Sequence, residues 1–291
     1  MRIILSRKGF DSSAGGCPSA ILPDGRLCSL PIPDDASSIS YGDIDYDGID
    51  LGELVDQLTR KTGWHRRGAH LDPDLRVDAL PRMPGWRPLL GQSGSAQGHL
   101  RNEGVTAGDL FLFFGSFRPV ELAPGGWRFC PGEAPMHAIW GWLRVGEILK
   151  VDELPAQAIP WARYHPHFAY GPDATNTLYL ATDKLSLDGL PPSFPGAGTF
   201  HYLNEHRVLT VPGSALQTCW QLPACFAPGE GQAGLSFHRN RSRWSIVGDR
   251  CVLNSAFRGQ EFVFDTQGRD QVLTWLGNLL MSAWIVSHRV V

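Results

Sequence analysis

A short segment in the first third of the chain alternates histidine with aspartate: residues 70–74 read His-Leu-Asp-Pro-Asp. In an extended backbone, side chains two residues apart project to the same side, which places His70, Asp72 and Asp74 together. Imidazole nitrogens and carboxylate oxygens bind iron, manganese or zinc, and His99 would complete such a set. The spacing therefore predicts a site for a divalent transition metal formed by His70, Asp72, Asp74 and His99.

The same segment has two other interpretations. A metal-free site would use His70, Asp72 and Asp74 as catalytic acid–base groups, because a carboxylate beside an imidazole shifts the pKa of both. A purely structural role is the third interpretation, with the aspartates capping a turn beside a solvated histidine.

A glycine-rich turn follows the first apolar run of the chain, and residues 8–16 read Lys-Gly-Phe-Asp-Ser-Ser-Ala-Gly-Gly. Glycines let backbone N–H groups approach the oxygens of a phosphate or carboxylate closely. Asp11 is a catalytic candidate in this turn. The expected substrate-binding residues are Lys8, Ser12, Ser13, Gly15 and Gly16. The run matches neither a Walker A loop nor a Gly-x-Gly-x-x-Gly fingerprint, and an Asx-turn is its structural alternative.

Basic and aromatic residues interleave in two places, between residues 60 and 87 and in residues 238–244, which read His-Arg-Asn-Arg-Ser-Arg-Trp. Arginines contact phosphates and aromatic rings stack on unpaired bases, so Arg239 is a further candidate for substrate binding. A solvated charged face is the alternative interpretation.

Periodicity predicts the elements that must position these residues. A strand over residues 2–8 leads into the glycine-rich turn, and a hairpin surrounds residues 23–26. Helices are predicted near 51–62 and from Arg269 to about Ser287. Further strands are predicted at 109–114, 136–145, 177–182, 207–211, 243–247, 251–255 and 261–265. We expect an α+β fold with a strand-rich mixed sheet or partial barrel, in a single domain over 1–291 with a possible β-rich sub-barrel around 105–265.

Composition limits the classes of function. The chain has 291 residues and a formal net charge of −3, so contact with nucleic acid should be local rather than extensive. The sequence holds no apolar stretch of about 18 residues, and we expect no membrane span. The apolar run at the start of the chain is too short for a signal peptide, and polar residues follow it too early. The six cysteines form no Cys-x-x-Cys pair, which favours reduced thiols in a cytoplasmic protein over a thiolate zinc site.

Residues 6–16, with 18–19, 23–26 and 30–34, form a long motif that resembles the nucleotide modification associated domain proteins of the third type. Residues 70–74 and 108–115 also fit this family, and the likeness runs over nearly the whole chain. The resemblance implies an association with systems that modify bases in DNA, often in phage or bacterial defence. It implies no particular reaction.

Two hypotheses of different class follow. The first is an enzyme acting on a nucleotide, nucleoside or modified base. The second is a non-enzymatic reader that holds a modified or flipped base in a β-barrel-like cup. The walls of that cup would come from Trp140, Trp142, His137 and Arg118.

Overall fold

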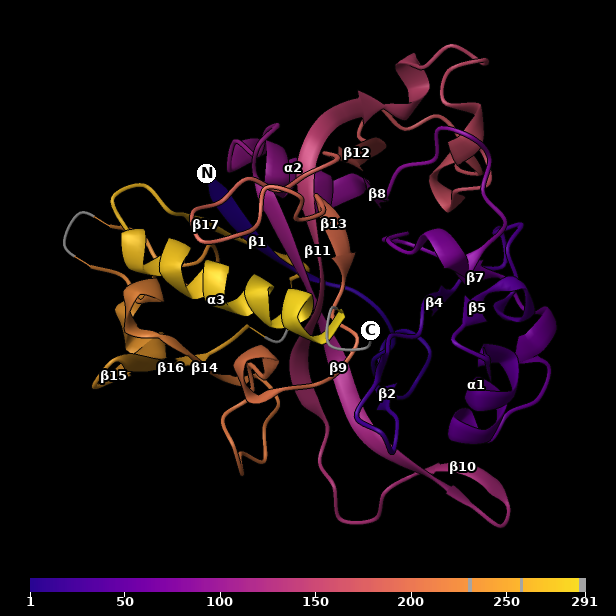
Figure 1. The fold of residues 1–291 in the computed structure, drawn as a ribbon, viewed down its shortest axis with the longest axis horizontal. Helices are drawn as coiled ribbons and strands as arrows, with labels where there is room; N and C mark the ends of the chain where they lie inside the picture. The colour runs from indigo at the N-terminus through magenta and orange to yellow at the C-terminus, as the bar shows by residue number, and fades with distance from the viewer. Residues whose placement is uncertain (230–231, 257–258, 288–291) are drawn as a thin grey trace.

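A mixed sheet forms the centre of the protein in a computed structural model that describes residues 1–229, 232–256 and 259–287. Its main path runs β17-β1-β9-β11-β12-β8 and curls into a half-barrel (Figure 1). The bounds of these strands are β1 (Arg2–Arg7), β8 (Leu89–Gln92), β9 (Leu110–Ala123), β11 (Met136–Lys150), β12 (Thr177–Ala181) and β17 (Glu261–Asp265).

The first strand lies inside this sheet. β1 runs parallel to β9 and antiparallel to β17, and its residues Ile3, Ile4 and Leu5 are fully buried. A strand covered on both faces needs an unbroken apolar run rather than an alternating one, which explains its sequence. Leaving the strand, Lys8 donates its backbone N–H to the carbonyl of Phe114 over 2.9 Å. The glycine-rich turn therefore lies at the carboxyl end of β1, within the sheet rather than at its edge.

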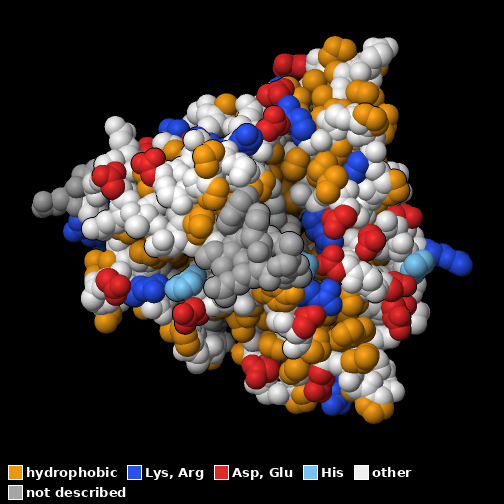
Figure 2. Space-filling model, in the orientation of Figure 1, with side chains coloured by type: hydrophobic (Ala, Val, Ile, Leu, Met, Phe, Trp, Pro, Cys, Tyr) orange, Lys and Arg blue, Asp and Glu red, His pale blue; other side chains and the backbone are white. Residues whose placement is uncertain are grey.

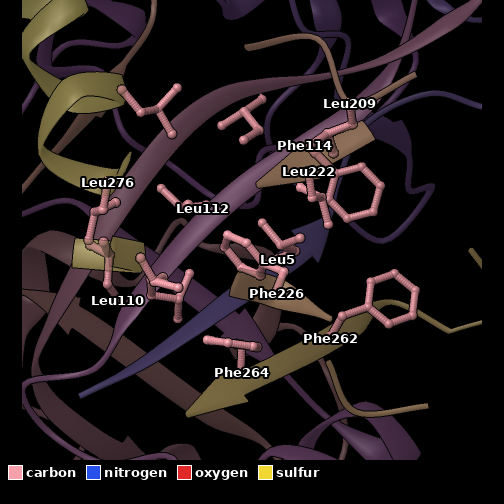
Figure 3. Packing of buried hydrophobic residues seen from close by; sticks show 14 of the residues in the cluster. Leu5, Leu110, Leu112, Phe114, Leu209, Leu222, Phe226, Phe262, Phe264 and Leu276 are labelled. Carbon is pink, nitrogen blue, oxygen red and sulfur yellow. The ribbon is translucent and has the colours of Figure 1, made fainter. Parts of the chain in front are cut away.

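Alternate residues of β9 serve two hydrophobic clusters on opposite faces of the sheet. Leu110, Leu112 and Phe114 join one cluster, whereas Phe111 and Phe113 join the other. Figure 3 shows the first cluster, where side chains of β9 pack with Leu5 of β1, Phe262 and Phe264 of β17 and Leu276 of the last helix.

Two layers of smaller elements cover the sheet (Figure 1). On one side lie α3 (Asp270–Ser287) and a small sheet of β14 (Cys219–Pro223), β15 (Trp244–Val247) and β16 (Arg250–Asn254). On the other lies α1 (Leu51–Thr59) with two small two-stranded sheets, β4 (Ile32–Pro33) with β7 (Ala69–His70) and β5 (Asp45–Tyr46) with β6 (Ile49–Asp50). The remaining elements are β2 (Ser19–Ile21), β3 (Leu27–Cys28), α2 (Gly94–Asn102), β10 (Gly126–Phe129) and β13 (Ala197–Thr199).

The predicted α+β fold with a strand-rich mixed sheet and two named helices is confirmed. α1 starts where expected because the Asp50 carboxylate accepts the backbone N–H of Glu53 over 2.9 Å. It ends at Thr59 rather than near 62, since Arg60 adopts the left-handed conformation with φ 55°.

The strand predicted at 207–211 was wrong. Residues Glu205–Arg207 form a 3-10 turn, and the segment that follows makes only isolated bridges to Ala138 and Trp220. The predictions also missed β8 and α2. The α2 sequence, Gly-Ser-Ala-Gln-Gly-His-Leu-Arg-Asn, contains two glycines, which are poor helix formers.

No helix in the described ranges is both long and apolar enough to cross a membrane. Figure 2 shows acidic and basic side chains interspersed over the visible face, in keeping with the small net charge.

Candidate functional site

A polar cavity of about 240 Å³ lies at the carboxyl end of β1. The glycine-rich turn and the histidine–aspartate segment both contribute to its walls, although they are far apart in the sequence. Among its lining residues are Lys8, Asp11, Ser13, His70, Asp72, Gly91, His167 and Tyr170.

Lys8 and Asp72 form the contact that joins the two segments. The Lys8 Nζ lies 3.3 Å from Asp72 Oδ2, and both side chains are largely buried. The other carboxylate oxygen, Asp72 Oδ1, accepts the backbone N–H of Gly91 over 2.6 Å. Burial raises the pKa of the Asp72 carboxyl, but the charge of Lys8 and two nearby imidazoles outweigh it and hold the pKa well below its usual range. Asp72 is therefore ionised at neutral pH.

His70 reaches the cavity from β7, where it stands opposite Ile32 of β4. Its Nδ1 lies 2.8 Å from Oδ2 of Asp34, the residue that follows β4. A carboxylate only accepts hydrogen bonds, so Nδ1 carries the proton and Nε2 keeps a lone pair. Burial lowers the pKa of His70 despite the nearby Asp72 and Asp34. A neutral imidazole thus presents Nε2 at 3.8 Å from Asp72 Oδ2.

His167 comes from a loop with a short 3-10 turn, Pro166–Phe168. Its Nδ1 lies 2.6 Å from Oδ1 of Asn176, whose Nδ2 donates in return to the His167 carbonyl. The amide orientation gives Nδ1 the proton and leaves the lone pair on Nε2. Burial lowers the pKa of His167 to about 4, so this imidazole is also neutral at pH 7.

A third imidazole, from His165, approaches Asp72 from behind. Its Nε2 is buried, lies 3.4 Å from Asp72 Oδ1 and makes no hydrogen bond. Its Nδ1 accepts the backbone N–H of His167, so Nε2 carries the proton. The nearness of this N–H to the carboxylate favours the ionised form of Asp72.

Two further residues shape the cavity around His167. A Cβ added to Gly91 would lie 2.2 Å from the His167 ring, so only glycine allows the imidazole to pack on β8. The ring of Tyr170 stacks over His70 with 6.2 Å between ring centroids, and it lies 4.8 Å from the ring of His167. Tyr170 therefore stands over the histidine pair.

One ligand atom each from His70, Asp72 and His167 lies within 4.8 Å of the other two. Two imidazole nitrogens and one carboxylate oxygen suit a divalent transition-metal ion. The same groups, with Lys8, also suit proton transfer to and from a bound molecule.

The glycine-rich turn is held by Asp11. Its Oδ1 accepts the N–H of Ser13, the N–H of Ala14 and the Ser13 hydroxyl, over 2.7, 2.9 and 2.6 Å. Gly15 has φ +89° and packs against the Phe10 ring, and Gly16 also has φ +89°, a left-handed conformation that favours glycine at both positions. The turn is thus an Asx-turn that borders the cavity.

A second cavity of about 380 Å³ lies across this turn. Lys8, Asp11 and Ser13 line both cavities, and Ser12 lines only the second. Polar residues that line it besides the turn include Ser116, His137, Gln217 and Thr218. Hydroxyl and amide groups of this kind can recognise the edge of a base.

Asp74 lies outside the histidine cluster. Arg82 donates to both of its carboxylate oxygens over 2.7 Å, and the hydroxyl of Tyr164 donates to Oδ2 over 2.5 Å. Its backbone pairs with Leu89 at the edge of β8. The carboxylate of Asp74 is fully buried and hydrogen-bonded. Asp74 therefore attaches the loop after β7 to β8 and does not face the cavity.

His99 and Arg239 also lie elsewhere. The Nε2 of His99 is 2.9 Å from the Ser236 hydroxyl, and its ring packs on Phe237. Arg239 is exposed and bonds both carboxylate oxygens of Glu103 over 2.8 Å. Neither residue lines the two cavities at the turn.

The four residues expected to form a base-binding cup do not share one pocket. Trp140 and Trp142 belong to the clusters on opposite faces of the sheet. His137 lines the second cavity, where its Nδ1 accepts the indole N–H of Trp220 over 2.9 Å. Arg118 donates to the carbonyl of Cys130 and lies over Phe129.

Sequence analysis missed several residues of the cluster. They are Asp34, His165, His167, Tyr170 and Asn176. A local signal existed for two of them, because residues 165–167 read His-Pro-His within a proline-rich loop. Asp34 and Asn176 carry no such signal, since their role depends on which histidine each contacts.

A mixed, half-barrel sheet with a buried histidine–carboxylate cluster at the end of its first strand defines a strand-rich α+β protein. The chain belongs to the nucleotide modification associated domain 3 family, whose model matches residues 2–265. It matches no curated protein and no solved structure. The family associates the chain with nucleotide modification.

Proposed function

We propose that the chain is an enzyme of nucleotide or DNA-base modification, acting on a nucleotide, nucleoside or modified base. The observation that carries this proposal is the contact of Lys8 with Asp72, which places the glycine-rich turn and the histidine cluster around one cavity. A domain family tied to nucleotide modification supports the class of substrate.

The two cavities divide the substrate between them. Lys8 and the turn at Asp11 border both cavities and suit a phosphate or ribose, because they offer an ammonium and hydroxyl groups. The base lies in the cavity that carries Ser116 and Gln217. The atoms that react lie toward His70 and Asp72, where a neutral imidazole stands beside an ionised carboxylate.

The division of aromatic residues between the two faces of the sheet supports an enzyme over a reader. A cup for a flipped base needs aromatic walls on both sides of the base. Trp140 and Trp142 are each buried in a different hydrophobic cluster. Several titratable side chains gather at the polar cavity, among them Lys8, His70, Asp72 and His167, which is typical of catalysis.

The test is a turnover assay on the purified full-length chain. Deoxynucleosides, their 5′-monophosphates and a single-stranded oligonucleotide are each incubated with the protein and with Fe²⁺, Mn²⁺ or Zn²⁺, then followed by mass spectrometry. We expect Asp11→Ala and His70→Ala each to abolish the mass change while thermal unfolding stays cooperative. The matched control is His206→Gln, an exposed histidine outside both cavities.

Unchanged turnover in both Asp11→Ala and His70→Ala would overturn this assignment of the site. Tight binding of the oligonucleotide by the wild-type chain without any mass change would favour the reader instead.

A further inference from the structure

We propose that His70, Asp72 and His167 bind one divalent transition-metal ion, with the two histidines coordinating through Nε2. This ion would share the cavity of the proposed function, on which the inference rests for its substrate. The ligand set differs from the one expected from sequence spacing: His167 takes the place of Asp74 and His99.

The first argument is the direction of the lone pairs. Both His70 and His167 give their Nδ1 proton to an oxygen acceptor, Asp34 in one case and Asn176 in the other. The free lone pair of each ring is therefore on Nε2. Neutral imidazole is the form that binds a metal ion, and in this form each ring points its proton at the oxygen acceptor and keeps Nε2 free for the ion.

The second argument is the support around the ligands. Histidines that coordinate a metal almost always donate their other N–H to a carboxylate or carbonyl, which fixes the ring and raises its basicity. Asp34 and Asn176 provide such acceptors at 2.8 and 2.6 Å. The N–H of Gly91 holds Asp72 by a hydrogen bond to Oδ1, and the Nε2 of His165 lies 3.4 Å from the same oxygen. A histidine pair with only a packing role would not require this.

The third argument is geometric. His70 Nε2 and Asp72 Oδ2 are 3.8 Å apart, and one ligand atom of each of the three residues lies within 4.8 Å of the others. Adjacent ligands on an ion with bonds of ~2.1 Å stand ~3 Å apart. Small side-chain rotations close this gap. Two histidines and one carboxylate leave the remaining coordination positions open, and here they would face the cavity.

The alternative to the metal site is a metal-free site in which Lys8 is the counter-ion of Asp72. Its ammonium lies 3.3 Å from Asp72 Oδ2 and neutralises the carboxylate as a metal ion would. If a metal binds, the ammonium competes with it for Asp72, and removing that charge should tighten metal binding. If Lys8 is the native counter-ion of a metal-free site, Lys8→Met should create no metal affinity.

The experiment measures metal binding to the full-length chain without any substrate. Titration calorimetry under anaerobic conditions uses Fe²⁺, Mn²⁺ and Zn²⁺, and the d–d absorption of Co²⁺ reports the ligand set. We expect one ion per chain. Asp72→Asn and His167→Gln should each weaken binding at least about 100-fold, and Asn176→Ala about 10- to 100-fold. Lys8→Met should tighten binding.

His99→Gln is the discriminating control, because it removes the ligand expected from sequence but lies outside the cluster. We expect unchanged stoichiometry and affinity in this variant. Failure to bind any of the four ions, or equal binding in wild type, Asp72→Asn and His167→Gln, overturns the metal site. His70→Gln, at a side chain that is 11% exposed against 2% for Asp72, provides a third ligand variant should the other two fail to fold.

These outcomes separate the two proposals. If the chain modifies a nucleotide in the presence of chelator and binds no ion, the proposed enzymatic function stands and the proposed metal site is wrong. If the chain binds one ion at these residues but changes no nucleotide, the proposed metal site stands and the proposed function is wrong.

Discussion

The ammonium of Lys8 lies 3.3 Å from Asp72 Oδ2, across 64 positions of sequence. Lys8 directly follows a buried central strand, and Asp72 is fixed by the N–H of Gly91 on β8. The contact thus links β8, at one end of the sheet order, with β1, which is the second strand from the other end. In this contact one buried cation balances one buried carboxylate.

Asp72 and Asp74 should respond differently to the same substitution. Asp74→Asn leaves Arg82, whose side chain is 7% exposed, without its buried counter-charge. We expect this change to lower the free energy of unfolding by about 3–5 kcal/mol. In Asp72→Asn the amide can still accept the Gly91 N–H, and Lys8 borders the cavity. Urea unfolding should therefore show a smaller loss for Asp72→Asn, and turnover should be abolished in this variant alone once folded fractions are matched. A larger stability loss for Asp72→Asn would contradict these roles.

Gly91→Ala tests the close packing of His167 on β8. The added Cβ would lie 2.2 Å from the His167 ring, so the imidazole must move away from Asp72. Overpacking of this kind costs about 1–3 kcal/mol. We expect a modest drop in melting temperature together with loss of turnover. Gly98→Ala, where a Cβ meets open space, is the matched control. Full activity in Gly91→Ala would show that the position of His167 does not matter.

His137 makes stability depend on pH. Burial is the largest cause that lowers its pKa from the ordinary 6.5 to about 3; the charge of Arg7 adds to this effect and that of Asp11 opposes it. The unfolded chain therefore binds the proton first, so stability is complete above pH 6.5 and falls as pH drops toward 3. The loss should reach a few kcal/mol, in roughly the range 3–5 kcal/mol.

The matched variant for this prediction is His137→Asn, whose amide oxygen can accept the Trp220 indole N–H as Nδ1 does. Urea unfolding between pH 7 and 4 should give a flatter profile for this variant than for wild type. Parallel profiles would mean that His137 does not titrate on unfolding in this range.

The strands and helices were predictable where burial leaves a local pattern. Each of three patterns lies within one short segment of the sequence. They are the apolar run of β1, the acidic residues before α1 and the apolar residues at helical spacing in α3. By contrast, α2 contains two glycines and has a weak amphipathic pattern. It forms because the folded sheet supports it, and a window of sequence does not show this.

The site was predictable only in part, because side-chain partners are set over long distances. Residues 70–74 suggested one shared side for His70, Asp72 and Asp74. The strand period fails after His70, where β7 ends, and Asp74 instead pairs with Leu89. His167 enters the cluster from almost 100 residues further along the chain. Its position depends on Asn176 and Gly91, which no local spacing connects to His70.

A crystal structure of the full-length chain soaked with a deoxynucleoside 5′-monophosphate tests the shared site most directly. We expect the nucleotide between Asp11 and His70, in contact with Lys8 and with its base in the cavity of Ser116 and Gln217. We also expect this density to be absent from crystals of Asp11→Ala. A nucleotide bound instead on the arginine-rich segment 238–244, with both cavities free of it, would contradict the assignment of the site to the end of the first strand.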